Sequence, residues 1–230
     1  MKRCIFTLAF MAFSLVSLSQ SGTIKVYNGK VIEGDFFKEK LFIFDNYING
    51  RIKLKDGTLY YGDLNINTLG QSLRVISDTG DTISIKTERE VDAVSAGNNY
   101  FIKLNNVYIQ IINTAGDLFL GMERSLKIGQ EKIEGAYGGT NDVSSISKLS
   151  TVEVDNKIEK IVGSSTLKYD YYERLYFVKN GKIIPITKKN FVKFFPGQKN
   201  MIEKYVADNN IKFNHNESVI KLFDYLAKNR

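Results

Sequence analysis

The chain of 230 residues has little of three residue types on which site chemistry often depends: one cysteine, one histidine and no tryptophan. Cys4 lies in an N-terminal apolar run, and removal of that run would leave no cysteine. Disulfides, redox chemistry, thiol catalysis and cysteine-ligated metals would then be excluded together. His215 alone cannot build a usual zinc site without cysteine. The absence of tryptophan, the largest stacking surface, argues against sugar binding.

The N-terminus has the three-part layout of a secretory signal peptide. Met1–Arg3 is cationic, Cys4–Leu18 carries no charge, and Ser17 and Ser19 are small residues at the −3 and −1 positions before Gln20. The apolar run is shorter than the roughly 20 residues of a membrane span, and no cysteine at its far end could be acylated. We therefore expect cleavage before Gln20, export to the periplasm or the cell exterior, and no lipid anchor.

Charge is distributed unevenly along the chain after this segment. Residues 20–147 carry 14 basic and 16 acidic side chains, whereas residues 148–230 carry 16 basic and 9 acidic ones. A basic half can bind nucleic acid or an anionic lipid surface. The lysines are scattered, however, and the longest run is Lys188-Lys189, which favours a solvated face. We expect no nucleic acid partner and no membrane-spanning segment after cleavage.

Turn-forming dipeptides recur between apolar or alternating stretches, which is typical of antiparallel β proteins. The dipeptides are Asn28-Gly29, Asn49-Gly50, Asp56-Gly57, Thr79-Gly80, Asn105-Asn106 and Asn180-Gly181. The predicted strands are Thr23–Tyr27, Leu41–Phe44, Arg51–Leu54, Leu73–Ser77, Thr82–Lys86, Tyr100–Leu104, Val107–Ile112, Leu118–Met122, Leu175–Val178 and Lys182–Ile186. Residues 28–36 and 56–64 read as two similar hairpins that each end in a Gly-Asp turn. Short strands with frequent turns predict a mainly β fold, an antiparallel sandwich or partly open barrel.

After Pro185 the apolar residues recur at helical spacing. Three short amphipathic helices are predicted, the first capped by Thr187 and the last by Asn216 or Ser218. Helices of this length are unstable alone in water, so we expect them to pack on the β-rich part. The predicted division is a signal peptide at 1–19, a β-rich domain at 20–186 and a helical segment at 187–230. No secondary structure is predicted for residues 124–165.

A sequence pattern resembles one in uncharacterised exported proteins of Bacteroidetes-type bacteria. It comprises Leu41–Thr58, which ends in Lys55-Asp56-Gly57-Thr58, and the following Leu64-Asn65-Ile66-Asn67. Ile66 replaces the aromatic residue that is usual in the second motif, and the Lys-rich helices of the C-terminus are also similar. The resemblance covers about two thirds of the mature chain. It implies an exported protein and this architecture, and it implies no site residues.

Few residues suggest catalysis. Asp78-Thr79-Gly80 spells the motif of aspartic proteases, but their mechanism needs a second such carboxylate, which the sequence lacks, and a hairpin turn explains the string. The sequence has no Gly-x-Ser-x-Gly elbow, and Gly135–Gly139, in the loop predicted at Gly135–Asp142, lacks the strand, the lysine and the helix of a phosphate loop. The acidic groups Asp78/Asp81, Glu88/Glu90/Asp92 and Asp117/Glu123 leave a hydrolase with dispersed carboxylates open.

One aromatic cluster, Tyr169-Asp170-Tyr171-Tyr172, could line an interface or bind sugar, but packing of a half-buried strand explains it better. No catalytic, cofactor-binding or metal-binding residue is assigned, and no cofactor is expected. The leading interpretation is a non-enzymatic, exported envelope or secreted protein that serves interaction or structure. The alternatives are a periplasmic carrier of an apolar, lipid-like ligand in a curved sheet, and the hydrolase. The expected partner is an envelope protein or an apolar ligand.

Overall fold

The computed structural model describes residues 20–76, 80, 82–84, 88–131 and 163–230, so the predicted signal peptide and the Gly135–Asp142 loop lie outside the described residues. The strands are β1 (Gln20–Tyr27), β2 (Lys30–Glu33), β3 (Ile48–Leu54), β4 (Leu59–Asn67), β5 (Ser72–Ile76), β6 (Thr82–Ser84), β7 (Val91–Ala96), β8 (Asn99–Leu104), β9 (Val107–Ala115), β10 (Leu118–Glu131), β11 (Ser164–Lys179) and β12 (Lys182–Pro185). The helices are α1 (Asp35–Lys40), the single-turn 3₁₀ helix η1 (Glu88–Glu90), α3 (Lys188–Phe194), α4 (Lys199–Asp208) and α5 (Asn216–Lys228).

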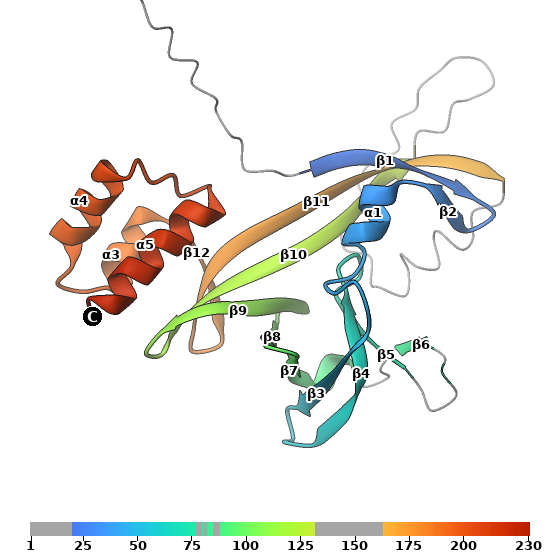
Figure 1. Cartoon of the computed structure of the whole chain (residues 1–230), viewed down its shortest axis with the longest axis horizontal. Helices are drawn as coiled ribbons and strands as arrows, with labels where there is room; N and C mark the ends of the chain where they lie inside the picture. Colours follow the sequence, from blue (N-terminus) through green and yellow to red (C-terminus); the bar gives the residue numbers. More distant parts are fainter. Residues whose placement is uncertain (1–19, 77–79, 81, 85–87, 132–162) are drawn as a thin grey trace, which may run out of the picture.

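The described strands form one antiparallel sheet in the order β2-β1-β11-β10-β9-β8-β7-β3-β4-β5-β6, and β12 pairs with β11 beside this path. The sheet does not close into a barrel, since β2 and β6 remain at its two ends. The prediction of a mainly β, antiparallel fold with C-terminal helices is therefore confirmed. The longest strands, β10 and β11, run from the C-terminal helices to the region of α1 (Figure 1).

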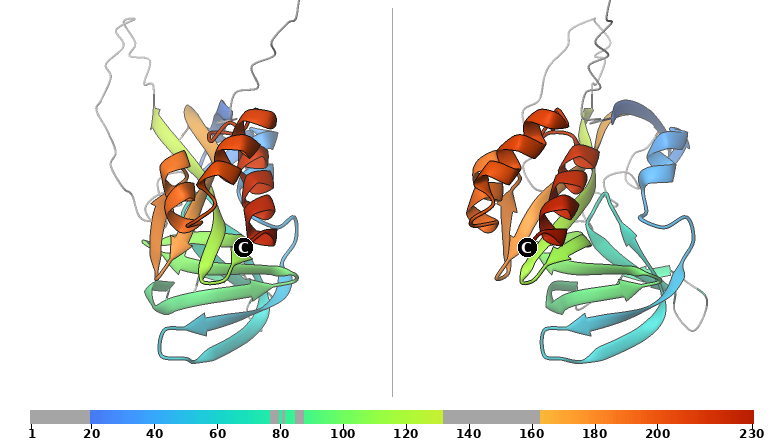
Figure 2. Two further views of the ribbon diagram at one scale, coloured as in Figure 1. Left: turned by 90° about the vertical axis from the view of Figure 1, so that its left-hand side faces the viewer. Right: turned by 60° about the vertical axis from the view of Figure 1, so that its left-hand side comes forward.

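Three separate hydrophobic clusters stabilise this sheet. The first joins β9, β10 and β11 to the three C-terminal helices, the second lies among β3, β4, β5, β7, β8 and β9, and the third joins β1 and β11 to α1. The first and third clusters lie toward opposite ends of the β10–β11 pair (Figures 1 and 2). A long two-stranded ribbon thus carries one core at each end.

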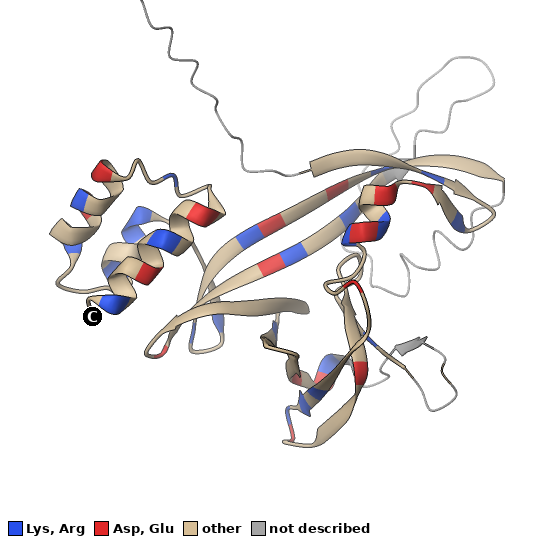
Figure 3. Cartoon of the chain, viewed as in Figure 1, with Lys and Arg blue, Asp and Glu red and all other residues tan. Residues whose placement is uncertain are grey.

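The C-terminal helices follow the sequence pattern closely. Thr187 caps α3 through a hydrogen bond from the Asn190 backbone N–H, as predicted. The cap prediction for α5 is wrong, because His215 occupies that position and no side chain caps the helix. Acidic and basic residues are interspersed on α4 and α5, whereas the charged residues of α3 are all lysines (Figure 3). Within the described residues, no helix is long and apolar enough to cross a membrane.

The hairpin turns agree with the sequence where both turn residues reach positive φ. Asn28-Gly29, Asn105-Asn106 and Asn180-Gly181 all do so. The predicted turn at Asn49-Gly50 is wrong, because both residues lie inside β3. The second Gly-Asp turn, at Gly62-Asp63, is also wrong, since β4 continues through it, whereas Gly34, at φ 127°, does end a hairpin and leads into α1.

The predicted strand Leu41–Phe44 is wrong, and Asn65 explains why. The Asn65 side chain accepts the Phe44 backbone N–H at 3.1 Å and donates to the Phe44 carbonyl at 2.7 Å. Asn67 accepts the backbone N–H groups of Leu69 and Gly70 at 2.9 and 3.0 Å. Both asparagines are buried. The Leu-Asn-Ile-Asn motif therefore has a structural role, because its amides satisfy backbone groups of neighbouring turns.

Gly50 is required by a close approach rather than by a turn. A Cβ added at Gly50 would lie 2.6 Å from the Ser95 carbonyl oxygen, whereas a Cβ at Gly62, its direct partner on β4, would meet nothing closer than 3.6 Å. We expect Gly50→Ala to destabilise the protein by about 1–3 kcal/mol, as overpacking does. Gly62→Ala is the matched control and should be neutral or slightly stabilising. Urea unfolding of both variants measures this, and equal effects would contradict it.

Candidate functional site

The outer edge of β11 is paired at both ends and unpaired between them. β1 pairs with β11 as far as Gln20, opposite Tyr171, and β12 pairs with it from Pro185, opposite Tyr176. Among the residues that the structure describes, none pairs as a strand with residues 172–175 on this edge, although β10 pairs with them on the other. We name this interval the β11 gap. A free strand edge offers backbone N–H and C=O groups with which another chain can pair.

A pocket of about 300 Å³ lies along the β11 gap. Its lining comes from the gap, from the end of β12 and from the segment that leads into α5: residues 172–176, Pro185, Ile186, Phe213, Asn214 and Asn216. Successive strand residues point to opposite faces of a sheet. The pocket therefore reaches around the strand edge and includes aromatic, apolar, amide and charged groups.

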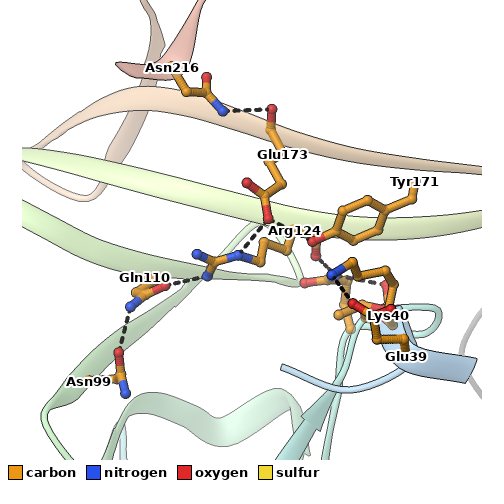
Figure 4. Close-up of polar contacts among 10 residues, drawn as sticks. Glu39, Lys40, Asn99, Gln110, Arg124, Tyr171, Glu173 and Asn216 are labelled. Carbon is orange, nitrogen blue, oxygen red and sulfur yellow. Dashed lines mark hydrogen bonds and ion pairs between the residues drawn. The ribbon is translucent and has the colours of Figure 1, made fainter. Parts of the chain in front are cut away.

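Glu173 lies in the middle of the gap and is held on three sides (Figure 4). Its backbone carbonyl accepts a hydrogen bond from the Asn216 side chain at 3.2 Å. Its carboxylate accepts from Arg124 Nε at 3.0 Å and from the Tyr171 hydroxyl at 2.8 Å. Burial and the bond to Glu173 raise the pKa of Tyr171. The carbonyl bond shows that the main-chain acceptor of Glu173 faces the gap.

The Glu173–Arg124 pair separates the two cores of the β10–β11 ribbon. On the face of this pair, Leu175 belongs to the cluster of the C-terminal helices, and Tyr171 belongs to the cluster of α1. The polar contacts continue from Arg124 to Gln110, whose side chain donates to Asn99 at 2.7 Å (Figure 4). Every second residue of β11 from Leu167 to Phe177 is thus buried, except the charged Glu173 in the gap, which is half-buried.

The opposite face of the gap presents an aromatic ring and a cation. The Tyr172 hydroxyl donates to the buried carboxylate of Glu123 at 3.0 Å, and Ser125 donates to the same oxygen at 3.1 Å. The exposed Arg174 lies 5.1 Å from the Tyr172 ring centroid and donates to the Tyr176 hydroxyl at 3.4 Å. These bonds orient the side chains on this face of the pocket before any ligand arrives.

On the opposite edge of the β10–β11 pair, β10 is covered beside the gap. Where β9 stops pairing with β10, the turn between β4 and β5 takes its place. Gln71 donates to the Arg124 carbonyl at 2.8 Å, and the Leu126 backbone N–H donates to the Thr68 carbonyl at 3.1 Å. The turn covers the edge of β10, whereas on the edge of β11 in the gap the Asn216 amide donates to the Glu173 carbonyl.

The residues considered as functional candidates in the sequence lie in different parts of the chain and do not form one site. Asp78 and Asp81 lie outside the described residues. His215 is half-buried between α4 and α5, and its carbonyl accepts the Val219 N–H at 3.1 Å. Of the tyrosine cluster, Tyr169 and Tyr171 are buried against α1, whereas Tyr172 lines the pocket. Packing thus explains two of the three rings, as the sequence analysis favours.

The carboxylates do not form a glycosidase-like pair at this site. Asp117 lies in the exposed turn before β10 and pairs with Lys179 at 3.0 Å, whereas Glu123 is buried further along the strand. Glu123 and Glu173 project from opposite faces, because each lies opposite a neighbour of the other in the β10–β11 register. Among the described residues, no group of three or more His, Cys, Asp or Glu side chains could hold a metal ion.

Comparisons with protein-family models, curated protein sequences and solved structures find no match to this chain. The function must therefore be inferred from the geometry alone. Sequence reasoning missed the gap, since strand pairing is not visible in one strand. One signal was present: Glu173 falls in the phase of Tyr169, Tyr171, Leu175 and Phe177, all of which are buried.

Proposed function

We propose that the protein is an exported, non-enzymatic interaction protein that binds an extended segment of an envelope protein at the β11 gap. The observation that carries this proposal is a strand edge with no strand partner among the described residues over positions 172–175, beside a pocket of about 300 Å³. In strand addition, main-chain hydrogen bonds supply affinity and side-chain pockets supply specificity. The gap offers both elements in one place.

The chemistry of the pocket supports binding more than transport or hydrolysis. A lipid-like cargo would favour an apolar lining, but Arg174, Asn214 and Asn216 line this pocket. Hydrolysis by two carboxylates would require them to flank one substrate, and Glu123 and Glu173 lie on opposite faces of the ribbon. An extended peptide suits a lining with an open main-chain edge, aromatic rings and amides.

Peptide binding tests this proposal directly. Short peptides selected by display against the protein that begins at Gln20 should bind in an extended form. N-methylation of those backbone amides that face β11 should weaken binding at least about tenfold, because each such amide loses a main-chain hydrogen bond. N-methylation of the alternate amides, which point away, is the matched control. Titration calorimetry on both peptide series gives the answer, and equal losses would exclude strand pairing.

Export has its own test. The mature protein is expected to begin at Gln20, because Ser17 and Ser19 present small side chains to the signal peptidase. N-terminal peptide mass spectrometry on cell-envelope fractions would detect this end, including its cyclised pyroglutamate form. Recovery of Met1 or Lys2 on most of the protein would contradict export with cleavage.

A further inference from the structure

The strands β3, β4, β7 and β8 carry an exposed surface on the face opposite their core, away from the C-terminal helices (Figures 1 and 2). Ile52 and Leu54 of β3 belong to the second hydrophobic cluster, and successive strand residues point to opposite faces. Arg51 and Lys53 therefore lie on the outer face, and both are exposed. Lys53 pairs with Asp92 at 2.9 Å. In the sheet order, β7, β8, β9 and β10 separate β3 from β11.

Strand register aligns exposed aromatic side chains with Arg51 on this outer face. Arg51 lies opposite Tyr61 of β4 and Ser95 of β7, and Ser95 is in turn opposite the β8 residue Tyr100. Directly opposite residues of neighbouring strands share a face. Tyr61 is 69 % exposed and Tyr100 is 46 % exposed, and Leu59, opposite Lys53, is also exposed. We name this surface the outer β3–β4 face, and it comprises Arg51, Lys53, Leu59, Tyr61, Asp63 and Tyr100.

One cation and one anion on the outer β3–β4 face are unmatched. No hydrogen bond or ion pair joins the Arg51 side chain to another of the described residues. The Asp63 carboxylate accepts a long bond from the Asn49 side chain, at 3.4 Å. Arg51 is opposite Tyr61, and Asp63 is opposite Asn49, so the two charged residues are diagonal neighbours, which lie about 7–8 Å apart in antiparallel pairs. The face therefore carries both signs of charge at a short distance.

We propose that the outer β3–β4 face binds a second copy of this chain in a twofold-symmetric dimer, in which Arg51 of each protomer pairs with Asp63 of the other. In a twofold interface, a residue i that contacts j implies that j also contacts i. One unmatched cation and one unmatched anion on the same face satisfy this rule. A partner with only acidic or only basic groups would leave one of the two charges unmatched. The inference goes beyond the proposed function, since this face is separate from the β11 gap.

The twofold axis that exchanges the two charges also brings Tyr61 to its own copy. This axis runs in the plane of the interface, perpendicular to the line from Arg51 to Asp63 and through its midpoint. Tyr61 lies close to the axis, because it stands opposite Arg51 and two residues from Asp63 on β4. The two Tyr61 rings would therefore meet, and aromatic pairs stabilise a contact beyond the area that they bury. Tyrosine and arginine are also enriched among the residues that dominate the binding energy of protein interfaces.

Sedimentation equilibrium of the protein that begins at Gln20 measures this association. An interface of standard size takes about 20–30 residues from each partner, which is more than the outer β3–β4 face provides. We therefore expect a weak dimer, with a Kd between about 10 μM and 1 mM. A protein that remains entirely monomeric at about 1 mM would overturn the proposal.

Charge reversal tests the pairing of Arg51 with Asp63. Either Arg51→Asp or Asp63→Arg alone should weaken self-association at least about tenfold, because the dimer of each variant contains two pairs of like charges. An equimolar mixture of the two variants should regain the affinity of the unaltered protein, because their heterodimer contains two pairs of opposite charge. Lys168→Asp is the matched control, since it reverses an exposed cation on β11 and should leave the dimer unchanged.

The mixture separates a twofold contact from any other association of this face. Single variants that dimerise as tightly as the unaltered protein would overturn the proposal, and so would a mixture that associates no better than its components. Thermal melting of each variant should stay within a few degrees of the unaltered protein, because both substitutions lie on the surface. The peptides that bind the β11 gap should bind the Arg51→Asp variant and the unaltered protein equally, so the dimer and the proposed function are tested separately.

Discussion

A chain that ends at Pro185 is expected to aggregate or to melt far below the full-length protein. The three C-terminal helices share one core with β9 to β11, and seven apolar side chains of this segment are at most 1 % exposed: Phe191, Phe195, Ile202, Val219, Leu222, Phe223 and Leu226. Each buried side chain of this kind contributes about 1.5–3 kcal/mol, against a net stability of roughly 5–15 kcal/mol for a whole domain. Thermal melting and light scattering of the shortened protein measure the loss.

A full-length control separates this structural role from partner docking by the basic helices. Lys189→Ala together with Lys199→Ala removes two exposed cations and leaves the core intact. This variant should melt within a few degrees of the unaltered protein, as surface changes usually do. A shortened protein that stays soluble and equally stable would instead identify residues 187–230 as a separate module.

Phe177→Ala is expected to destabilise the protein by about 3–5 kcal/mol, which is typical of a buried phenylalanine. Phe177 is fully buried on β11, and its ring centroid lies 4.8 Å from that of Phe191, 5.3 Å from that of Phe194 and 6.2 Å from that of Phe223. The substitution leaves a cavity where α3 and α5 meet the sheet. Urea unfolding of the variant gives the free-energy difference.

Tyr100→Ala provides the comparison for this substitution, since it also removes an aromatic ring from a strand. Tyr100 on β8 is 46 % exposed, so its loss should cost no more than about 0.5 kcal/mol. A Phe177→Ala effect as small as that of Tyr100→Ala would mean that the helices do not depend on the sheet for their core.

Local features of the fold were predictable where a residue and its neighbours in the chain determine the backbone conformation. Asn28-Gly29 and Asn180-Gly181 form turns because both residues tolerate positive φ. Thr187 caps α3 because its hydroxyl reaches the Asn190 N–H within the same turn. Prediction failed at Gly50, where the same residue type serves a close approach between strands. It also failed at Leu41–Phe44, where Asn65 replaces a strand partner.

The candidate site could not be predicted in this way, because a gap is a property of three strands together. The side chains of Tyr172 and Arg174 read as an ordinary strand in the sequence. Within the described part of the chain, their edge lies between Tyr171, where the pairing with β1 ends, and Tyr176, where the pairing with β12 begins. The local feature that could have indicated the site is the charged Glu173, which alternates with buried residues of β11.

The sequence by itself determined the β-rich class, several hairpin turns and the three amphipathic helices of this protein. These follow from backbone preferences and from the periods of 2 and 3.6 residues, which act over a few positions of one chain. Only the tertiary structure decided which strands pair, where the pairing of β11 stops and which face the helices cover. Those choices depend on the packing of residues far apart in the chain, such as Phe177 against Phe223 and Asn216 against Glu173.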